Sequence, residues 1–213
     1  RFTLSTYSPQ SKRIPLSPKK IEGNRNFINK VWNATRFALG YLEDATVGAE
    51  PPVATLLANR WILSRLSSVV GVVRKGIEDF RIDDSALGVY HFFWGELCDW
   101  FLELTKPVFV AKEESPAMAK ETADVLAYVL EATLRLLHPF IPFITEELWQ
   151  KLPRPADAPL SLALAKFPDD GTGRRDDQAE KDMAIVQAVI GAARSIRSEH
   201  DIRPSAEVPL TLR

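Results

Sequence analysis

Hydrophobic residues recur every three or four positions from Ser17 onward, the spacing that places them on one face of an α-helix. Glycines and prolines interrupt this pattern and divide it into six expected helices, at about 17–42, 55–79, 83–105, 116–138, 142–151 and 176–199. Ser17 followed by Pro18 is a typical helix start, because serine caps the first turn and proline suits its first position. Pro107 is expected to end the third helix. The pattern therefore predicts an all-α, antiparallel bundle of five or six helices.

Two short stretches do not follow the helical spacing. Residues 160–166, within a segment rich in proline, aspartate and glycine, and the alternating tail 208–212 are expected to be extended. The chain starts at Arg1 without an initiator methionine, so it is interpreted as a piece of a longer protein. We expect a linker at 1–16, one helical domain at 17–200, and the start of a truncated extension at 201–213.

The overall charge is close to zero, but its distribution is uneven. The 213 residues carry a net charge of −1 and are 46% hydrophobic, which excludes a wholly basic nucleic-acid binder and a disordered acidic tail. Residues 1–42, however, hold eight basic side chains and one acidic side chain, a net charge of +7, whereas the remainder carries −8. A basic segment on an acidic body indicates a local contact with an anionic partner.

Cysteine content and hydropathy restrict the cellular setting. The single Cys98 excludes an internal disulfide and a cysteine-based zinc site, which is typical of a reducing compartment. The uncharged stretch 85–95, which no other in the chain exceeds in length, is too short for a membrane helix. We therefore expect a cytoplasmic protein with no membrane partner, and a monomeric one. Cys98 has apolar neighbours, so we expect it in the core.

One aromatic residue of the first long helix lies outside the apolar face. When residues 26–42 are projected at about 100° per residue, the apolar side chains occupy one half of the helix, and the opposite arc is polar. Phe37 falls in the middle of the polar arc, one and two turns after Asn33 and Lys30. Another helix or loop could cover it. Alternatively, its ring stacks on an unpaired base, while Asn33 hydrogen-bonds a base edge and Lys30 pairs with phosphate.

The residues of this helix resemble a known family. The string KIEGNRNFINKVWNATRF (20–37) is similar to the anticodon-binding domain of valyl-tRNA synthetase, as are NRWILSRL (59–66), CDWFLELTK (98–106), HPFIPFITEELW (138–149) and IRSE (196–199). The resemblance covers nearly the whole chain. Isoleucyl and leucyl relatives share the second and fourth strings in looser form, whereas 27–37 and 98–106 favour the valine member.

The resemblance implies a fold and a set of contacts. It implies the helical anticodon-binding domain of a class Ia aminoacyl-tRNA synthetase, with the anticodon stem-loop of tRNA(Val) as partner and the catalytic domain of the same parent chain as neighbour. Motif matching places Lys30, Asn33 and Phe37 on the contact surface and Lys19 near its start. We expect Lys19 and Lys30 to hold phosphate, and Asn33 and Asn26 to contact base edges. Asn24 departs from the bulkier or apolar residue expected there.

The resemblance also implies what this segment lacks. The parent enzyme uses ATP and Mg²⁺ to attach valine to its tRNA, but no ATP-binding signature of such an enzyme occurs here, so we expect no catalytic residue and no cofactor in this chain. Residues 1–16 then follow the catalytic core. Additional contacts with the RNA backbone are expected from four arginines, Arg25, Arg36, Arg194 and Arg197.

Three alternatives remain at this point. Glu96, Asp99 and Glu103 share a face of the third helix and could suggest a di-metal site, but the Glu-x-x-His pairs that such bundles use are absent, which favours an ion-paired acidic face. The chain could be the same domain of an isoleucyl or leucyl relative. It could also be a helical module whose basic helix binds an acidic protein.

Overall fold

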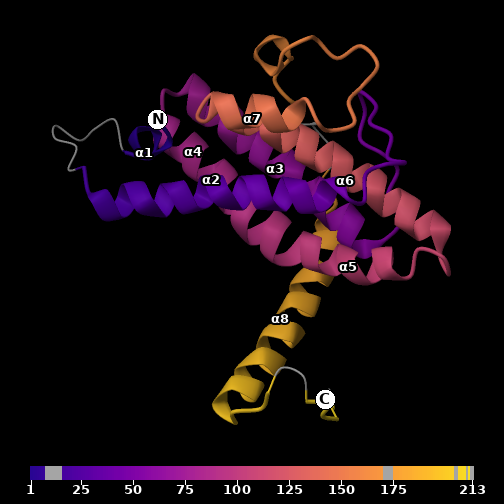
Figure 1. Ribbon diagram of the computed structural model, residues 1–213. Helices are drawn as coiled ribbons and strands as arrows, with labels where there is room; N and C mark the ends of the chain where they lie inside the picture. The colour runs from indigo at the N-terminus through magenta and orange to yellow at the C-terminus, as the bar shows by residue number, and fades with distance from the viewer. Residues whose placement is uncertain (8–15, 170–174, 204–205, 210, 212–213) are drawn as a thin grey trace.

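The computed structural model describes residues 1–7, 16–169, 175–203, 206–209 and 211. Within these residues the secondary structure is helical, as the sequence predicts, and it contains no strand. The elements in chain order are α1 (Phe2–Ser5), α2 (Pro18–Leu39), α3 (Leu57–Glu78), α4 (Ile82–His91), η1 (Phe92–Phe101), α5 (Leu102–Val110), α6 (Pro116–Leu137), α7 (Pro142–Trp149), η2 (Leu162–Leu164) and α8 (Asp177–Glu199). Figure 1 shows α2 through α7 gathered in one bundle, from which α8 projects.

The third predicted helix differs from its expected form in two ways. It continues from α4 through η1, a ten-residue π-helical stretch, into α5. Pro107 lies inside α5 and does not end it, so the expected end at residue 105 is wrong. The proline is exposed, so its ring faces solvent, and the next turn places Phe109 in the core. Burial of that aromatic ring offsets the hydrogen bond that proline cannot donate.

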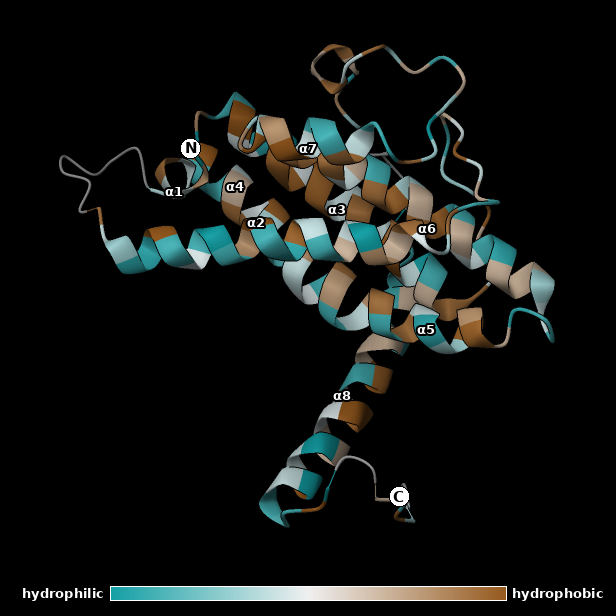
Figure 2. Ribbon diagram, viewed as in Figure 1, coloured by the Kyte–Doolittle hydropathy of each residue, from teal (hydrophilic) through white to brown (hydrophobic). Residues whose placement is uncertain are grey.

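A cluster of aromatic rings joins α2 to α1 and to the helix formed by α4 and η1. Phe27 is fully buried, and its ring centroid lies 4.9 Å from that of Phe2, 4.7 Å from that of Tyr90 and 5.8 Å from that of Phe93. Contacts at these distances combine apolar burial with favourable ring geometry. The hydropathy colouring in Figure 2 shows brown residues along the inner sides of the packed helices.

Residues 1–7, predicted to belong to a linker, pack on the bundle. Phe2 is 3% exposed within the aromatic cluster, and Asn24 Nδ2 donates a hydrogen bond of 2.8 Å to Thr3 Oγ1. Asn24, the position that departs from the family pattern, therefore ties α2 to α1. Residues 8–15 of the expected linker lie outside the described residues.

The two stretches expected to be extended form no strand where they are described. Residues 160–166 instead contain the 3₁₀ turn η2, so this prediction is wrong. The turn forms because Glu146 of α7 accepts hydrogen bonds from the Ser161 hydroxyl at 2.9 Å and from the Leu162 amide at 3.0 Å, which pins the loop to the bundle. Of the tail 208–212, residues 208, 209 and 211 have no regular secondary structure, and residues 210 and 212 lie outside the described part.

A buried carboxylate joins α6 to α7. Glu131 is 2% exposed and accepts a hydrogen bond from Trp149 Nε1 at 2.8 Å. Its other oxygen accepts from Arg135 at 2.7 Å, so the charge is paired inside the same helix. A buried carboxylate with both oxygens occupied avoids the cost of an unpaired charge.

Helix α8 is attached through its first turns. Asp176 caps it by accepting from the Ala179 amide at 2.9 Å and pairs with Arg60 of α3 at 2.7 Å. Glu180 pairs with Arg65 of α3 at 3.2 Å. Among the residues of α8, Ala179 and Met183 are buried, and the rest of the helix projects from the bundle (Figure 1). Across the described part of the chain, no helix is both long enough and apolar enough to cross a membrane.

The corner between α3 and α4 depends on a small residue. A Cβ atom added to Gly76 would overlap with Ser85 Oγ and lie 3.0 Å from the Arg81 carbonyl oxygen, which is backbone that cannot move aside easily. A Cβ atom added to Gly71, one and a half turns earlier in α3, would meet nothing within 4 Å.

Alanine at these two glycines should have opposite effects on stability. Gly76→Ala should lower the free energy of unfolding by about 1–3 kcal/mol, because it overpacks the corner. Gly71→Ala should raise it by about 0.5–1 kcal/mol, because alanine restricts the unfolded chain and favours the helix. Urea unfolding followed by circular dichroism measures both, and equal changes in the two variants would show that the close approach at Gly76 is absent.

Candidate nucleic-acid interface

The polar face of α2 points to solvent along its whole length. The residues that α2 buries are Phe27, Val31, Ala34, Thr35 and Ala38, all from the apolar half of the projection. Lys19, Asn26, Asn33 and Phe37 are exposed, and Lys30 is half-buried. Lys19 and Phe37 are separated by five helical turns, so they share one face about 27 Å long. The face predicted from the sequence is therefore present as one surface.

Three of the predicted contact residues line a single groove. Lys30, Asn33 and Phe37 of α2 form one side of an open cavity of about 220 Å³. The opposite side comes from η1 and α5, and its lining residues are Cys98, Leu102, Glu103 and Lys106. Figure 1 shows α2 running beside this helix. We call this cavity the α2–α5 groove.

Phe37 lies at the mouth of the groove and keeps part of its ring free. Its side chain remains 37% exposed, so no helix or loop of the described chain covers it fully. Tyr41 contacts it edge to face at 5.2 Å between ring centroids, and Tyr41 in turn stacks on Phe109 of α5 at 4.4 Å. Lys106 Nζ lies 5.5 Å from the Phe37 ring centroid. Tyr41 therefore supports the Phe37 ring from one side, and Lys106 places a cation beside it. This arrangement is suited to holding a flat, electron-rich ligand.

The floor of the groove is apolar and chemically inert. Leu102 and Cys98 are each 5% exposed, and Ala34 is 8% exposed. Burial raises the pKa of the Cys98 thiol to about 12, so the thiol stays protonated at neutral pH and does not act as a nucleophile. Cys98 is a core residue, as its apolar neighbours indicate.

The acidic row on the third helix is occupied by cations. Glu96 pairs with Arg65 of α3 at 2.6 Å, and Asp99 pairs with Lys30 at 3.3 Å. Glu103 pairs with Lys106 at 2.7 Å. This is the ion-paired face that the sequence favoured over a di-metal site. No cluster of metal-ligating side chains occurs among the described residues.

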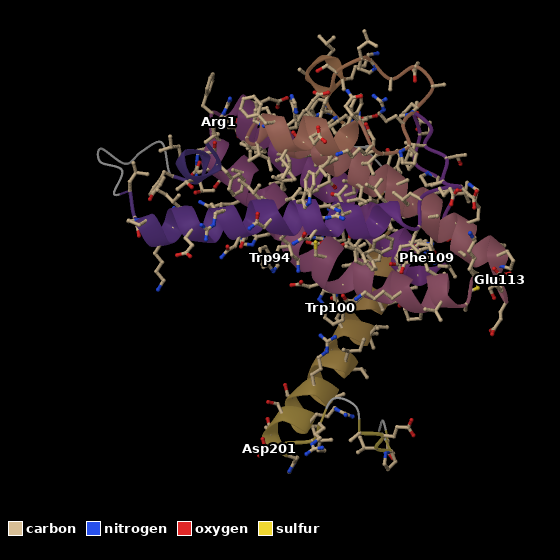
Figure 3. All side chains as sticks on the ribbon, in the orientation of Figure 1. Arg1, Trp94, Trp100, Phe109, Glu113 and Asp201 are labelled. Carbon is tan, nitrogen blue, oxygen red and sulfur yellow. The ribbon has the colours of Figure 1, made fainter. Side chains whose placement is uncertain are left out.

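The four arginines predicted to touch an RNA backbone lie outside the groove. Arg25 pairs with Glu22 at 3.3 Å, and Arg36 is exposed in the last turn of α2. Arg194 lies on the projecting helix α8, with its guanidinium 5.4 Å from the Trp100 ring centroid (Figure 3 labels Trp100). Arg197 donates to the Ala206 carbonyl oxygen at 2.8 Å and thereby holds the tail against α8.

Glu103, Lys106 and Tyr41 belong to this site but were not selected from the sequence. Tyr41 lies at the border of the apolar arc in the projection, and Glu103 and Lys106 are part of the string at 98–106. Their charges alone give no signal, because an acidic and a basic residue three positions apart on a helix are common on solvated surfaces.

Comparisons with known proteins identify similar sequences among tRNA ligases. Residues 59–212 match the family described as the anticodon-binding domain of tRNA ligase. The chain is 43% identical over its whole length to the valine–tRNA ligase of Geobacter sulfurreducens, of which it covers 24%. It is 44% identical to that of Stenotrophomonas maltophilia, covering 22%, and 40% identical to that of Zymomonas mobilis, covering 24%. The chain thus spans about a quarter of the length of these curated relatives.

A solved structure shares the fold at lower sequence identity. The crystal structure of a ternary LeuRS–tRNA–LeuAMS complex from Agrobacterium radiobacter contains a segment that superimposes with a TM-score of 0.58. The match has 19% identity and covers 83% of this chain and 20% of the other. This similarity shows that the two proteins share the helical fold.

Proposed function

The chain belongs to the family of anticodon-binding domains of tRNA ligases, and from this premise we propose that it recognises the anticodon stem-loop of tRNA(Val). The observation that carries the proposal is the row formed by half-buried Lys30 and exposed Asn33 and Phe37, on a chain 40–44% identical to valine–tRNA ligases along nearly all of its length. The groove combines an aromatic ring, an amide and a cation, which are the groups that read unpaired bases.

In the proposed complex each side chain has a separate task. Phe37 stacks on one anticodon base, and Asn33 and Asn26 hydrogen-bond base edges. Lys30 and Lys19 hold phosphates, and Arg25, Arg36, Arg194 and Arg197 add contacts to the RNA backbone. The net charge of +7 over residues 1–42 supports this assignment, because α2 contributes most of the exposed cations of that segment.

The proposal places catalysis elsewhere in the parent chain. This segment corresponds to about a quarter of its valine–tRNA ligase relatives, and we assign the attachment of valine, which uses ATP and Mg²⁺, to the remaining part. The segment then acts as a monomeric module joined to the catalytic domain, in the cytoplasm where translation takes place. No residue of this chain is proposed to be catalytic or to bind a cofactor.

Two alternatives give different binding behaviour. The same domain of an isoleucyl or leucyl enzyme would prefer another anticodon, and a helical protein-interaction module would bind no anticodon specifically. The similarity to valine–tRNA ligases over the whole chain favours the valine anticodon over the other two readings.

The deciding experiment compares four RNA stem-loops that differ in the anticodon. All valine anticodons share A and C at their second and third positions. The chain should bind a valine anticodon stem-loop at least about tenfold more tightly than a scrambled one, since reading each of these two bases contributes about 1–3 kcal/mol. Stem-loops with isoleucine and leucine anticodons should bind with intermediate affinity. Fluorescence anisotropy at one fixed salt concentration measures the set, and equal affinity for the valine and scrambled anticodons would refute the proposed function.

Phe37→Ala should weaken binding without unfolding the chain. Loss of base stacking should cost about 1–3 kcal/mol of binding free energy to the valine stem-loop. The matched control is Phe143→Ala, which removes an aromatic ring that is 84% exposed on α7 and outside the groove, and it should bind normally. If Phe37→Ala abolished the helical circular dichroism signal instead, Phe37 would be acting as a core residue.

Lys30→Ala should change the salt dependence of binding. Removal of one phosphate contact should reduce the slope of log K against log salt by about 0.7–1 and weaken binding to all anticodons to a similar degree. Lys75→Ala on α3 removes the same charge from a side chain that is 79% exposed and lies outside the groove, so its slope should match that of the unmodified chain. An unchanged slope for Lys30→Ala would show that Lys30 holds no phosphate.

A further inference from the structure

A single arginine of α3 joins α8 to the helix that forms the second wall of the α2–α5 groove. Arg65 donates from Nε and Nη2 to the two carboxylate oxygens of Glu96 in η1, at 2.6 and 3.0 Å. Its third nitrogen, Nη1, donates to Glu180 of α8 at 3.2 Å. The three side chains are 20–33% exposed, so water screens their charges only in part. We call this cluster of three residues the Arg65 junction.

The guanidinium group of Arg65 suits a junction between three helices. It is planar and carries five N–H donors in a fixed fork. Two parallel hydrogen bonds to one carboxylate fix the direction of Glu96 as well as its distance, and the remaining nitrogen reaches Glu180. Hydrogen bonding to Glu96 and the charges of both carboxylates raise the pKa of Arg65, so the group stays cationic.

Helix α8 contacts η1 at a second point as well. The Arg194 guanidinium lies 5.4 Å from the ring centroid of Trp100, four residues after Glu96. Within α8 the buried residues are Ala179 and Met183, both in its first two turns. Apolar packing therefore holds the base of α8, and the contacts with η1 determine the direction of the rest.

The same part of η1 supports the groove. Cys98 lies in the floor of the groove, and Asp99 pairs with Lys30 of α2 at 3.3 Å. The residues that connect η1 to α2, to the groove floor and to α8 thus fall within five successive positions, 96–100. Any change in the position of η1 acts on the groove and on α8 together.

Resting on the proposed anticodon-binding function, we infer that Arg65 is a positioning residue, which fixes α8 at one angle to the groove so that a single RNA contacts both. The groove binds the loop of the RNA, and Arg194 on the projecting part of α8 contacts the backbone of the same molecule. Because α8 is already fixed, the RNA does not have to order it on binding, and the contact costs little conformational entropy. Arg65 itself does not touch the RNA.

The alternative is a local attachment of α8 to α3. Glu180 also accepts a hydrogen bond from Ser64 Oγ at 2.5 Å, and Asp176 pairs with Arg60 at 2.7 Å, so α3 has contacts of its own with α8. Under this alternative Glu96 has no influence on α8, since its hydrogen bonds go to α3. Replacement of Glu96 therefore separates the two assignments.

The test uses Glu96→Gln, which keeps the shape of the side chain but removes its charge and one acceptor. Spin labels are placed on Glu113→Cys, in the turn after α5, and on Ser198→Cys, near the end of α8; Figure 3 labels Glu113 and Asp201 at these two ends. The native Cys98 is 5% exposed and burial raises its pKa to about 12, so it does not take the label.

Double electron–electron resonance measures the distribution of distances between the two labels. The chain with an intact Arg65 junction should give one narrow distribution. Glu96→Gln should widen it at least about twofold, because the fork loses one of its two acceptors and no longer fixes α8.

RNA binding supplies a second measurement, which a purely structural role of Glu96 would not change. With the junction intact, Arg194→Ala should weaken binding of the valine stem-loop about threefold, because one contact with the RNA backbone is lost. In the Glu96→Gln background the same substitution should change the affinity by less than about 1.5-fold, a coupling that a double-mutant cycle isolates.

A second variant and a matched control complete the set. Arg65→Lys keeps the charge but lacks the fork, so it should widen the distance distribution as Glu96→Gln does, and it serves as the test if Glu96→Gln does not fold. Glu78→Gln makes the same change in charge at an exposed residue at the end of α3, and it should keep the narrow distribution. Circular dichroism should show equal helix content in all variants.

The outcomes separate this inference from the proposed function. A narrow distribution in both Glu96→Gln and Arg65→Lys would overturn the inference, and so would a wide distribution with an unchanged effect of Arg194→Ala. If the unmodified chain does not distinguish the valine anticodon from a scrambled one, the proposed function fails, whereas the labels still report whether Arg65 fixes α8. A wide distribution together with loss of the Arg194 effect supports the inference.

Discussion

Burial of Phe27 among aromatic rings sets the orientation of α2, and the candidate site depends on that orientation. The ring is fully buried against Phe2, Tyr90 and Phe93, and such burial contributes about 2–3 kcal/mol. Each residue of a helix is turned by about 100° from the next, so fixing Phe27 inward also fixes Lys30, Asn33 and Phe37 outward. The contact surface therefore needs no loop to position it, because it is the reverse side of a well-packed helix.

The sequence predicted individual helices more accurately than the contacts that form between different helices. The polar arc of α2 follows from periodicity within one segment, and the structure reproduces it. The second wall of the groove could not be found in this way, because Glu103 and Lys106 lie more than sixty residues after Phe37 and share no periodic pattern with it. The expected stop at Pro107 was wrong because local propensity was overridden by the burial of Phe109. The 3₁₀ turn at Leu162–Leu164 depends on Glu146, a distant acceptor that no local pattern signals.

The charged side chains near the groove form ion pairs and do not build an unbroken basic surface. The acidic body, with a net charge of −8 outside residues 1–42, would repel RNA if its carboxylates were all free. Near the groove they are paired: Asp99 holds Lys30 and Glu103 holds Lys106. An approaching phosphate must compete with these carboxylates for the same lysines. An RNA that does not fit the groove therefore gains little binding free energy from the lysines. The arrangement favours ligands that also fill the groove and contact Phe37.

Helix α8 is held mainly by its first turns and extends well beyond them. Polar contacts from α3 hold its first turn, through Arg60 with Asp176 and Arg65 with Glu180. The helix continues to Glu199 with little further burial, a projection of roughly 28 Å beyond Glu180. A second contact lies further along the helix, where the Arg194 guanidinium is 5.4 Å from the ring centroid of Trp100 in η1. A tilt of about 10° at the base would move the far end by about 5 Å, so the two ion pairs with α3 and the Arg194–Trp100 contact together decide where the end of α8 points.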